Sequence, residues 1–291
     1  MKRAIAWGMA ALVLLAVLLL TGVSGGSQGV FYRVLGGRNE MVILGSIHAG
    51  SREMYPMRQA IRQALRNADV LVFECDTQSA EAIAASQRLM YYPQGETLAD
   101  HISPACFERV QSVLPGAERM KPWAAVSLLA LQNMADEAGA SGDLGVEKQV
   151  RKLGGSKPRE YLETAEEQLL IMDGFSPELQ EYLLWDAVDP EADEDVQHWP
   201  GWWAQGDAEA FARSYREDLA QEERPDLAQE YHASLITARN LRMAQRLAQM
   251  LEDGQGESYF VTVGLMHLVL GEDSVLGELE KLGYTIEKIT Q

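Results

Sequence analysis

Short apolar runs near both ends of the chain predict β-strands. Residues 30–35 and 41–47 are apolar and flank the turn-rich stretch 36–39, which is the pattern of a β-hairpin. Residues 69–73 predict a strand covered on both faces, because residues 70–73 form a continuous apolar run. Near the C-terminus, similar runs predict two more strands, at residues 259–263 and 284–289.

Apolar residues at helical spacing predict helices between these strands. Residues 56–67 carry Met57, Ile61 and Leu65 four residues apart, after a proline that suits a helix start. Residues 79–139 are predominantly helical in pattern, and further helices are predicted at 144–153, 227–251 and 274–282, with a short strand at 157–162. We therefore predict an α/β (mixed α+β) fold: a central mixed β-sheet formed from both chain ends, flanked by helices, with a large helical insert in the middle.

The first residues differ from the rest of the chain. Met1-Lys2-Arg3 is basic and residues 4–20 are apolar and uncharged, which predicts a signal peptide or an N-terminal membrane anchor over 1–23. Residues 24–29 are expected to be a linker and residues 30–291 one domain. The basic start should remain cytoplasmic, so we expect an extracytoplasmic protein that is periplasmic, secreted, or held on the membrane by an uncleaved segment.

Composition narrows the classes of partner. With 291 residues, 47% of them hydrophobic, the chain can bury a sizeable core. The net charge of −18 repels phosphate backbones and argues against nucleic-acid binding. We interpret Cys75 as a buried core residue and leave open whether it pairs with Cys106. We interpret the tryptophans at 199, 202 and 203 as packing residues.

Two Gly-x-x-His motifs each follow a predicted strand. Gly45-Ser46-Ile47-His48 follows a strand near the N-terminal end, and Gly264-Leu265-Met266-His267 follows one near the C-terminal end. Each glycine lets the chain turn sharply or pack closely. Each histidine is then expected in a loop at the carboxyl edge of its strand, where open α/β sheets bind ligands. The two imidazoles converge if their strands are neighbours.

Glu74 directly follows a third apolar strand, where a carboxylate is costly to bury without a partner. His48, His267 and Glu74 form a common set of ligands for a divalent metal ion, with a position open for water. The same three groups can act without a metal, as general base and orienting acid. The sequence leaves both uses open. The remaining histidines are interpreted as surface residues: His101, His198 and His232.

This ordered set of motifs resembles the TraB/PrgY/GumN family, whose animal relatives include the Tiki proteins. The likeness covers nearly all of the chain after the N-terminal segment, and it rests first on the two Gly-x-x-His motifs and on Phe73-Glu74. It continues in three further segments: Gly145-Val146-Glu147, the Leu-Glu-Thr-x-x-Glu-Gln-like stretch at 161–168, and Arg239-Asn240. Leu265-Met266 departs from the small residues common at that place in the family, so a narrower pocket is expected.

The resemblance implies a fold similar to the erythromycin-esterase and ChaN-like group. Tiki proteins are described as metal-dependent peptidases that prefer manganese or cobalt. Carried over to this chain, the resemblance implies that His48, Glu74 and His267 bind such an ion, with zinc as a further option. These three residues and Glu163 are expected to form the catalytic set, and the expected substrate-binding residues are Ser46, Arg239 and Asn240.

The leading hypothesis is therefore a membrane-targeted metallohydrolase that cleaves a peptide or amide bond in a peptide or small-molecule substrate. Water bound to the ion would be activated for attack, with Glu163 as general base or as the group that orients a ligating histidine. One alternative is a metal-free esterase-type hydrolase in which His48 is the base and Glu74 fixes its tautomer. Another is a non-catalytic protein that binds a peptide signal or a metal.

Overall fold

The structure is a computed structural model that describes residues 26–188, 196–221, 223–254 and 256–290. The predicted signal or anchor segment at 1–23 lies outside these residues, as does the start of the predicted linker. None of the helices within the described residues is long and apolar enough to cross a membrane.

Six strands form one mixed sheet in the order β4-β3-β5-β2-β1-β6. Strands β2, β5, β3 and β4 run parallel to one another, and β1 pairs antiparallel with both β2 and β6. The sheet predicted from the two chain ends is confirmed, and β4 adds one edge strand from the middle of the sequence. The strands are β1 Phe31–Leu35, β2 Glu40–Ser46, β3 Val70–Phe73, β4 Arg159–Tyr161, β5 Ser258–Gly264 and β6 Thr285–Lys288.

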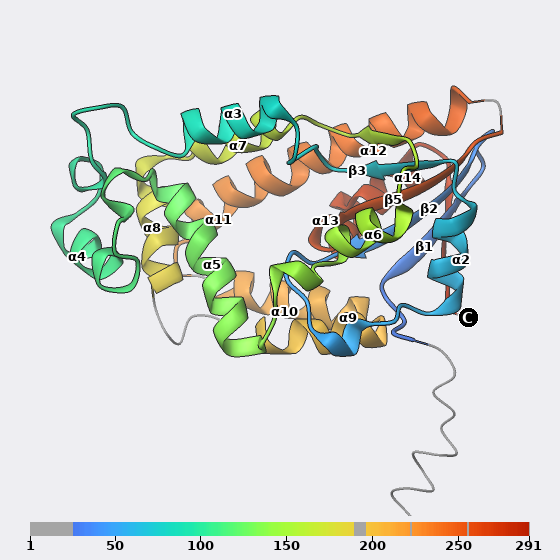
Figure 1. The fold of residues 1–291 in the computed structure, drawn as a ribbon, viewed down its shortest axis with the longest axis horizontal. Helices are drawn as coiled ribbons and strands as arrows, with labels where there is room; N and C mark the ends of the chain where they lie inside the picture. The colour runs from blue at the N-terminus through green and yellow to red at the C-terminus, as the bar shows by residue number, and fades with distance from the viewer. Residues whose placement is uncertain (1–25, 189–195, 222, 255, 291) are drawn as a thin grey trace, which may run out of the picture.

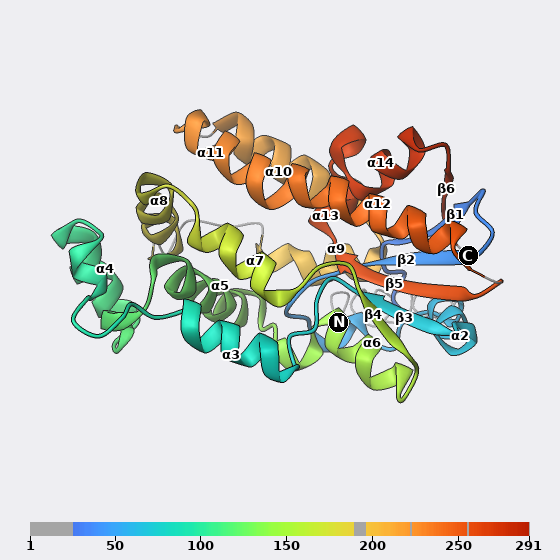
Figure 2. The ribbon, with the colours of Figure 1, turned by 90° about the horizontal axis from the view of Figure 1, so that it is seen from above.

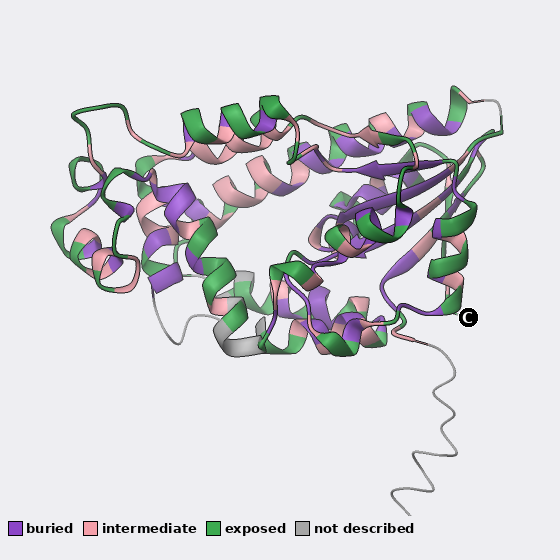
Figure 3. Ribbon diagram, viewed as in Figure 1, coloured by how far each residue is buried: buried purple, intermediate pink, exposed green. Residues whose placement is uncertain are grey.

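The sheet is covered by helices on both faces, which explains its continuous apolar runs. Every residue of β3 is buried. In β5, Phe260 packs into the core on one face, whereas Tyr259, Val261 and Val263 pack into the core on the other. Figure 3 shows the central strands β2, β3 and β5 as continuously buried parts of the molecule.

Helices α2 (Gln59–Asn67), α6 (Val146–Gly154), α9 (Trp199–Gln205) and α10 (Ala208–Gln221) contribute to the first core. Helices α12 (Ala238–Glu252) and α14 (Val275–Lys281) contribute to the second. Figure 2 shows α2 and α6 on one side of the sheet and α12 and α14 on the other. Trp203 is fully buried in the first core, so its interpretation as a packing residue is confirmed.

The middle of the chain forms a helical lobe at one end of the sheet (Figure 1). Its helices enclose a core of their own that contains Cys106, and Cys106 and Cys75 are both buried free thiols. Two of the helices begin where serine hydroxyls accept backbone N–H bonds, Ser79 from Ala82 and Ser103 from Cys106. The lobe consists of α3 Ala80–Leu89, α4 Pro104–Val113, α5 Pro122–Ala138, α7 Ala165–Asp173 and α8 Pro177–Val188.

The segment predicted as one long helix at 227–251 contains an irregular turn. It comprises α11 (Pro225–Tyr231), a π-helical turn over His232–Thr237, and α12. A π-helical turn holds one residue more than an α-helical turn, which shifts the direction of all later side chains by about 100°. The turn ends two residues before Arg239, so it sets the direction in which that side chain leaves the helix.

Short turns of 3-10 helix connect several of these elements, and α13 (Met266–Val269) follows β5 directly. The 3-10 turns are Arg52–Met54, Leu98–Asp100, Ala117–Arg119, Gly142–Leu144, Val196–His198 and Gly271–Asp273.

Candidate active site

Three neighbouring parallel strands deliver the predicted site residues to one edge of the sheet. Strand β5 lies between β3 and β2, with Phe73 opposite Thr262 and Ser46 opposite Gly264. Glu74 follows β3, His267 follows β5 and His48 follows β2. The two histidine-bearing strands are therefore neighbours, which is the condition that the sequence prediction required for their convergence.

The motif glycines allow close packing at this edge. A Cβ atom on Gly45 would lie 2.5 Å from Leu265 Cδ1, and one on Gly264 would lie 3.0 Å from Glu74 Oε1. The Gly264 N–H donates to Glu74 Oε1, and the Trp203 indole N–H donates to the Gly45 carbonyl at 2.7 Å. The two glycines thus allow the two Gly-x-x-His motifs to contact each other and allow Glu74 to pack against the second motif.

Arg239 lies at the centre of a buried ion-pair cluster. Its guanidinium pairs with Glu74 through Nη2 and Oε2 at 2.6 Å, and with Glu163 through Nε and Oε1 at 3.0 Å. The side chains are 7% (Arg239), 13% (Glu74) and 5% (Glu163) exposed, so water screens these pairs little. The Gln168 amide donates to both carboxylates, at 3.2 Å from Glu74 Oε2 and 2.8 Å from Glu163 Oε1.

The charges around Glu74 decide its ionisation. Burial raises the pKa of Glu74, but the cationic forms of His267 and Arg239 and the Gly264 N–H outweigh burial and lower that pKa to about 2. Glu74 is therefore a carboxylate at neutral pH. Glu163 precedes Thr164, the N-cap residue of helix α7, and its carboxylate pairs with Arg239 rather than capping that helix.

The protonation of His267 follows from its two neighbours. Asn240 Nδ2 donates to the carbonyl of Asp273 at 2.6 Å, so the Asn240 oxygen must face His267 Nδ1, which lies 2.6 Å away. His267 Nδ1 therefore carries the hydrogen, and its Nε2 lone pair accepts from Arg239 Nη1 at 2.9 Å. Burial lowers the pKa of His267 to about 4, so this imidazole is neutral at pH 7.

His267 was predicted in a loop, and that detail is wrong: it lies in the short helix α13. The helix begins at once because Leu265 N–H donates to the Ser46 carbonyl and the Leu265 carbonyl then accepts from Leu268. The turn carries His267 back over the sheet edge, where the ring is buried beneath Arg239 rather than facing solvent.

His48, in contrast, is exposed. Within the described part of the chain no hydrogen bond engages its ring. Its positive form contributes to lowering the pKa values of Glu74, Glu147 and His267, which places the imidazole within electrostatic reach of all three. His48 therefore lies at the same edge of the sheet as the cluster, and within the described residues neither of its ring nitrogens has a hydrogen-bond partner.

Glu147 is a site residue that the sequence analysis noted in a family motif and did not include among the catalytic groups. Val146 N–H donates to the Ile47 carbonyl at 3.1 Å, and a Cβ on Gly145 would lie 2.2 Å from the His48 carbonyl oxygen. This contact docks the start of α6 against the first histidine motif. Burial raises the pKa of Glu147, and its pairing with Arg151 at 2.8 Å only partly offsets that effect.

The other predicted residues lie within or beneath this cluster. Ser46 is buried as the last residue of β2, and Asn240 is fully buried where it orients His267. The substrate-binding roles of Ser46, Arg239 and Asn240 stay predictions. The three remaining histidines lie outside the cluster: His101 stacks on Tyr92, His198 stacks on Trp202, and half-buried His232 bonds to the Tyr215 hydroxyl.

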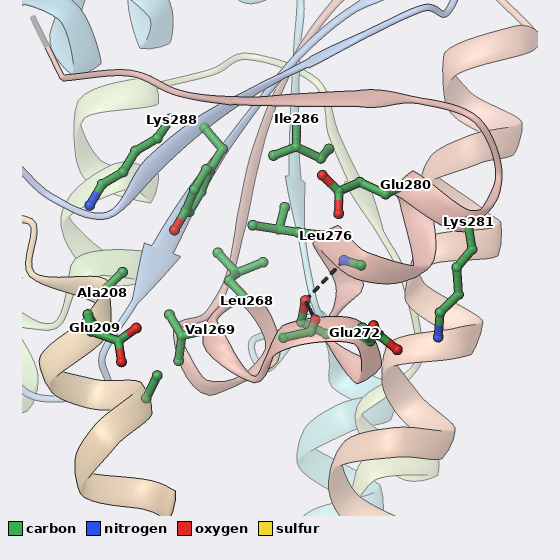
Figure 4. A pocket seen from close by; sticks show the side chains of 15 residues that line it. Ala208, Glu209, Leu268, Val269, Glu272, Leu276, Glu280, Lys281, Ile286 and Lys288 are labelled. Carbon is green, nitrogen blue, oxygen red and sulfur yellow. Dashed lines mark hydrogen bonds between the residues drawn. The ribbon is translucent and has the colours of Figure 1, made fainter.

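A separate cavity of about 950 Å³ lies on the far side of α13 (Figure 4). Leu268 and Val269 of α13 line it, together with residues of α10, α14 and β6. None of the predicted site residues lines this cavity, so we distinguish it from the candidate active site.

The family model described as "TraB/PrgY/gumN family" matches residues 30–288. Two curated proteins, each named "Uncharacterized protein YbaP", from Escherichia coli (strain K12) and Shigella flexneri, are 25% identical to the chain over 146 residues. The match covers 47% of this chain and 53% of each relative, so the chain spans about half the length of the curated relatives it matches. No solved structure matches the chain.

Proposed function

The chain belongs to the TraB/PrgY/gumN family, and on that premise we propose that it is a hydrolase of peptide, amide or ester bonds in which His48 activates water. One observation carries the proposal: His48 is exposed, its ring has no hydrogen-bond partner among the described residues, and the polar groups of the neighbouring buried cluster are already bonded to one another. A general base must reach water with an unoccupied lone pair, and His48 meets that requirement whereas His267 does not.

The buried cluster supports this role through its charge. Two carboxylates, Glu74 and Glu163, face one guanidinium, which leaves a net charge of about −1 next to His48. A negative charge nearby stabilises the imidazolium that forms when His48 accepts a proton from water. Glu74 acts here by charge alone, because its oxygens are bonded to Arg239, Gln168 and Gly264 rather than to His48.

Glu147 is suited to supply the proton that the leaving group needs. In the proposed step, the water oxygen attacks the carbonyl carbon, His48 takes the water proton, and the departing nitrogen or oxygen receives a proton from Glu147. A carboxyl group whose pKa is raised by burial keeps its proton to higher pH, as this step requires. The docking of Gly145 on the His48 carbonyl keeps the two residues on the same side of the cluster.

The divalent ion expected at His48, Glu74 and His267 does not fit the arrangement as it stands. The His267 Nε2 lone pair and Glu74 Oε2 both accept from Arg239, and the other Glu74 oxygen accepts from Gly264. Among the described residues, no three histidine, cysteine or acidic side chains are grouped so as to hold an ion. The proposed step therefore uses no metal ion, and the test compares reactions with and without manganese, cobalt and zinc.

We also propose that this activity is extracytoplasmic, from the basic start and apolar run of residues 1–23. Fractionation of cells that express the chain with a C-terminal tag tests this location. Recovery of the tagged chain in the soluble cytoplasmic fraction would contradict it.

The test of the function is a screen of peptide, amide and ester libraries with the purified full chain, in water enriched in ¹⁸O and read by mass spectrometry. Parallel reactions contain a chelator, or added manganese, cobalt or zinc. The variants are His48→Ala, Glu147→Gln and, as a matched control, His101→Ala, which removes an exposed histidine in the helical lobe.

We expect products that carry ¹⁸O from the parent and from His101→Ala, and a loss of roughly 100-fold or more in His48→Ala, as removal of a general base typically causes. Full turnover in His48→Ala would overturn the proposal. Saturable binding of a library member without turnover would also overturn it, in favour of a binding protein. If a chelator abolishes the activity and added metal restores it, the result would instead support the hypothesis of a metal-dependent hydrolase.

A further inference from the structure

We infer that the guanidinium of Arg239 is the resident cation of the cluster formed by Glu74, Glu163 and His267, and that it takes the position a divalent ion would otherwise occupy. The inference concerns which cation this cluster holds, and it does not depend on whether the chain catalyses hydrolysis.

The geometry of the contacts carries the inference. Each nitrogen of the guanidinium faces a carboxylate or imidazole of the cluster: Nε and Nη2 face Glu163, Nη2 also faces the candidate metal ligand Glu74, and Nη1 faces the candidate metal ligand His267. These groups come from four elements that are far apart in the chain, namely the ends of β3 and β4, helix α12 and helix α13. One planar cation thus contacts two carboxylates and one imidazole, and this is a set of groups that binds many divalent ions in proteins.

The acceptor atoms of Glu74, Glu163 and His267 have no free lone pair directed to the centre of the cluster. His267 Nδ1 is protonated towards Asn240, so Nε2 is its single lone-pair nitrogen, and Arg239 occupies it. Glu74 Oε2 and Glu163 Oε1 each accept both from Arg239 and from Gln168. An ion could bind here only after the guanidinium had moved away.

The fold favours arginine over lysine at this position. A planar fork with five N–H donors reaches acceptors several ångströms apart, whereas the three N–H groups of a lysine radiate from a single nitrogen. The π-helical turn that ends at Thr237 sets the direction of the Arg239 side chain, and the Leu235 carbonyl within that turn accepts from Arg239 Nη1. Burial lowers the pKa of Arg239, but the paired carboxylates outweigh burial and raise that pKa, so the cation persists at any pH at which the protein folds.

The inference makes a specific prediction for Arg239→Ala. The substitution removes the cation and leaves two nearly buried carboxylates beside the Nε2 lone pair of a neutral imidazole. The like charge that opposes a divalent ion is also gone. Repulsion between two unit charges about 4 Å apart in a partly buried site corresponds to roughly a 1000-fold change in affinity, and a divalent ion is repelled more strongly. Arg239→Ala should therefore bind Co²⁺ or Zn²⁺ at least about 1000-fold more tightly than the parent.

The experiment compares four full-length proteins: the parent, Arg239→Ala, Arg239→Lys and the double variant Arg239→Ala/His267→Ala. Each is stripped with a chelator and titrated with Co²⁺. Visible absorption reports the coordination of the bound ion, and metal content is measured after gel filtration. Arg239→Lys is the matched control because it keeps the positive charge and should bind no more cobalt than the parent.

The inference is supported if stripped parent and Arg239→Lys retain no stoichiometric cobalt, Arg239→Ala binds one ion, and the double variant loses it. It is overturned if the parent itself binds one ion tightly, or if folded Arg239→Ala gains no affinity. Should Arg239→Ala not fold, the melting temperature of the parent with and without chelator still decides, because a resident metal would make it fall on chelation. Hydrolysis enters none of these readouts, so failure here leaves the proposed function to be judged by its own assay.

Discussion

The pair Asn240–His267 offers a test of how the site is held together. Asn240 has no exposed surface; it accepts from His267 Nδ1 and donates to the Asp273 carbonyl, both at 2.6 Å. Leucine has a similar volume, so Asn240→Leu removes both hydrogen bonds without opening a large cavity. The variant therefore isolates the polar contribution of this side chain.

The magnitude follows from what each partner loses. The His267 N–H remains buried without an acceptor, which costs about 1–3 kcal/mol. The Asp273 carbonyl belongs to an exposed residue and can turn to water, so its loss adds little. We expect Asn240→Leu to lower the free energy of unfolding by about 1–3 kcal/mol.

Urea unfolding measures this change as a shift in the transition midpoint at constant slope. Asn133→Leu is a suitable control, because Asn133 is half-buried and donates one bond, to the Ala187 carbonyl at 3.2 Å. The ¹⁵N chemical shifts of the His267 ring report its tautomer in parallel. If Asn240→Leu is as stable as the parent and the hydrogen stays on Nδ1, the assignment of Asn240 as the residue that orients His267 fails.

Two further predictions concern pH and packing at the same edge. The folded pKa of Glu74 is lowered to about 2 and that of His267 to about 4, so for both groups the unfolded state binds more protons on acidification. The free energy of unfolding should therefore decrease as the pH is lowered. His267 causes this decrease between about pH 6.5 and 4, and Glu74 causes it between about pH 4.5 and 2. Urea midpoints measured across pH check this, and His267→Gln should abolish the upper part of the slope; a midpoint independent of pH from 7 to 4 in the parent would contradict it. Gly45→Ala should cost about 1–3 kcal/mol because its Cβ would lie 2.5 Å from Leu265 Cδ1, whereas Gly142→Ala, with no atom within 4 Å, should be neutral within about 0.5 kcal/mol; equal melting temperatures for the two variants would refute the close packing.

The elements of the sheet could be predicted because their patterns are local. Strand β3 is an uninterrupted apolar run since helices cover both of its faces, and the β1–β2 hairpin is marked by the turn residues between its strands. The π-helical turn before Arg239 escaped prediction, because the apolar spacing of 227–251 is compatible with a regular helix and the extra residue is fixed only by packing.

The candidate site could be predicted in part for the same reason. A histidine or glutamate directly after an apolar strand must lie at the carboxyl edge of the sheet, whatever the rest of the fold does. Glu147 carries a weaker signal, a glycine-led acidic residue, and its place beside His48 depends on a backbone contact between Gly145 and His48 that no local pattern encodes.

By itself, the sequence determined which residues reach the sheet edge, because strand ends and glycine turns are set by neighbouring residues. Only the tertiary structure decided which strands are neighbours, and that Arg239 lies among Glu74, Glu163 and His267. Arg239 and Glu74 are 165 residues apart in the chain, and their pairing depends on the packing of α12 over the sheet. The same packing gathers Glu74, Glu163 and His267 around Arg239 while His48 stays exposed, because the charge of a buried site depends on the groups that the tertiary fold brings together.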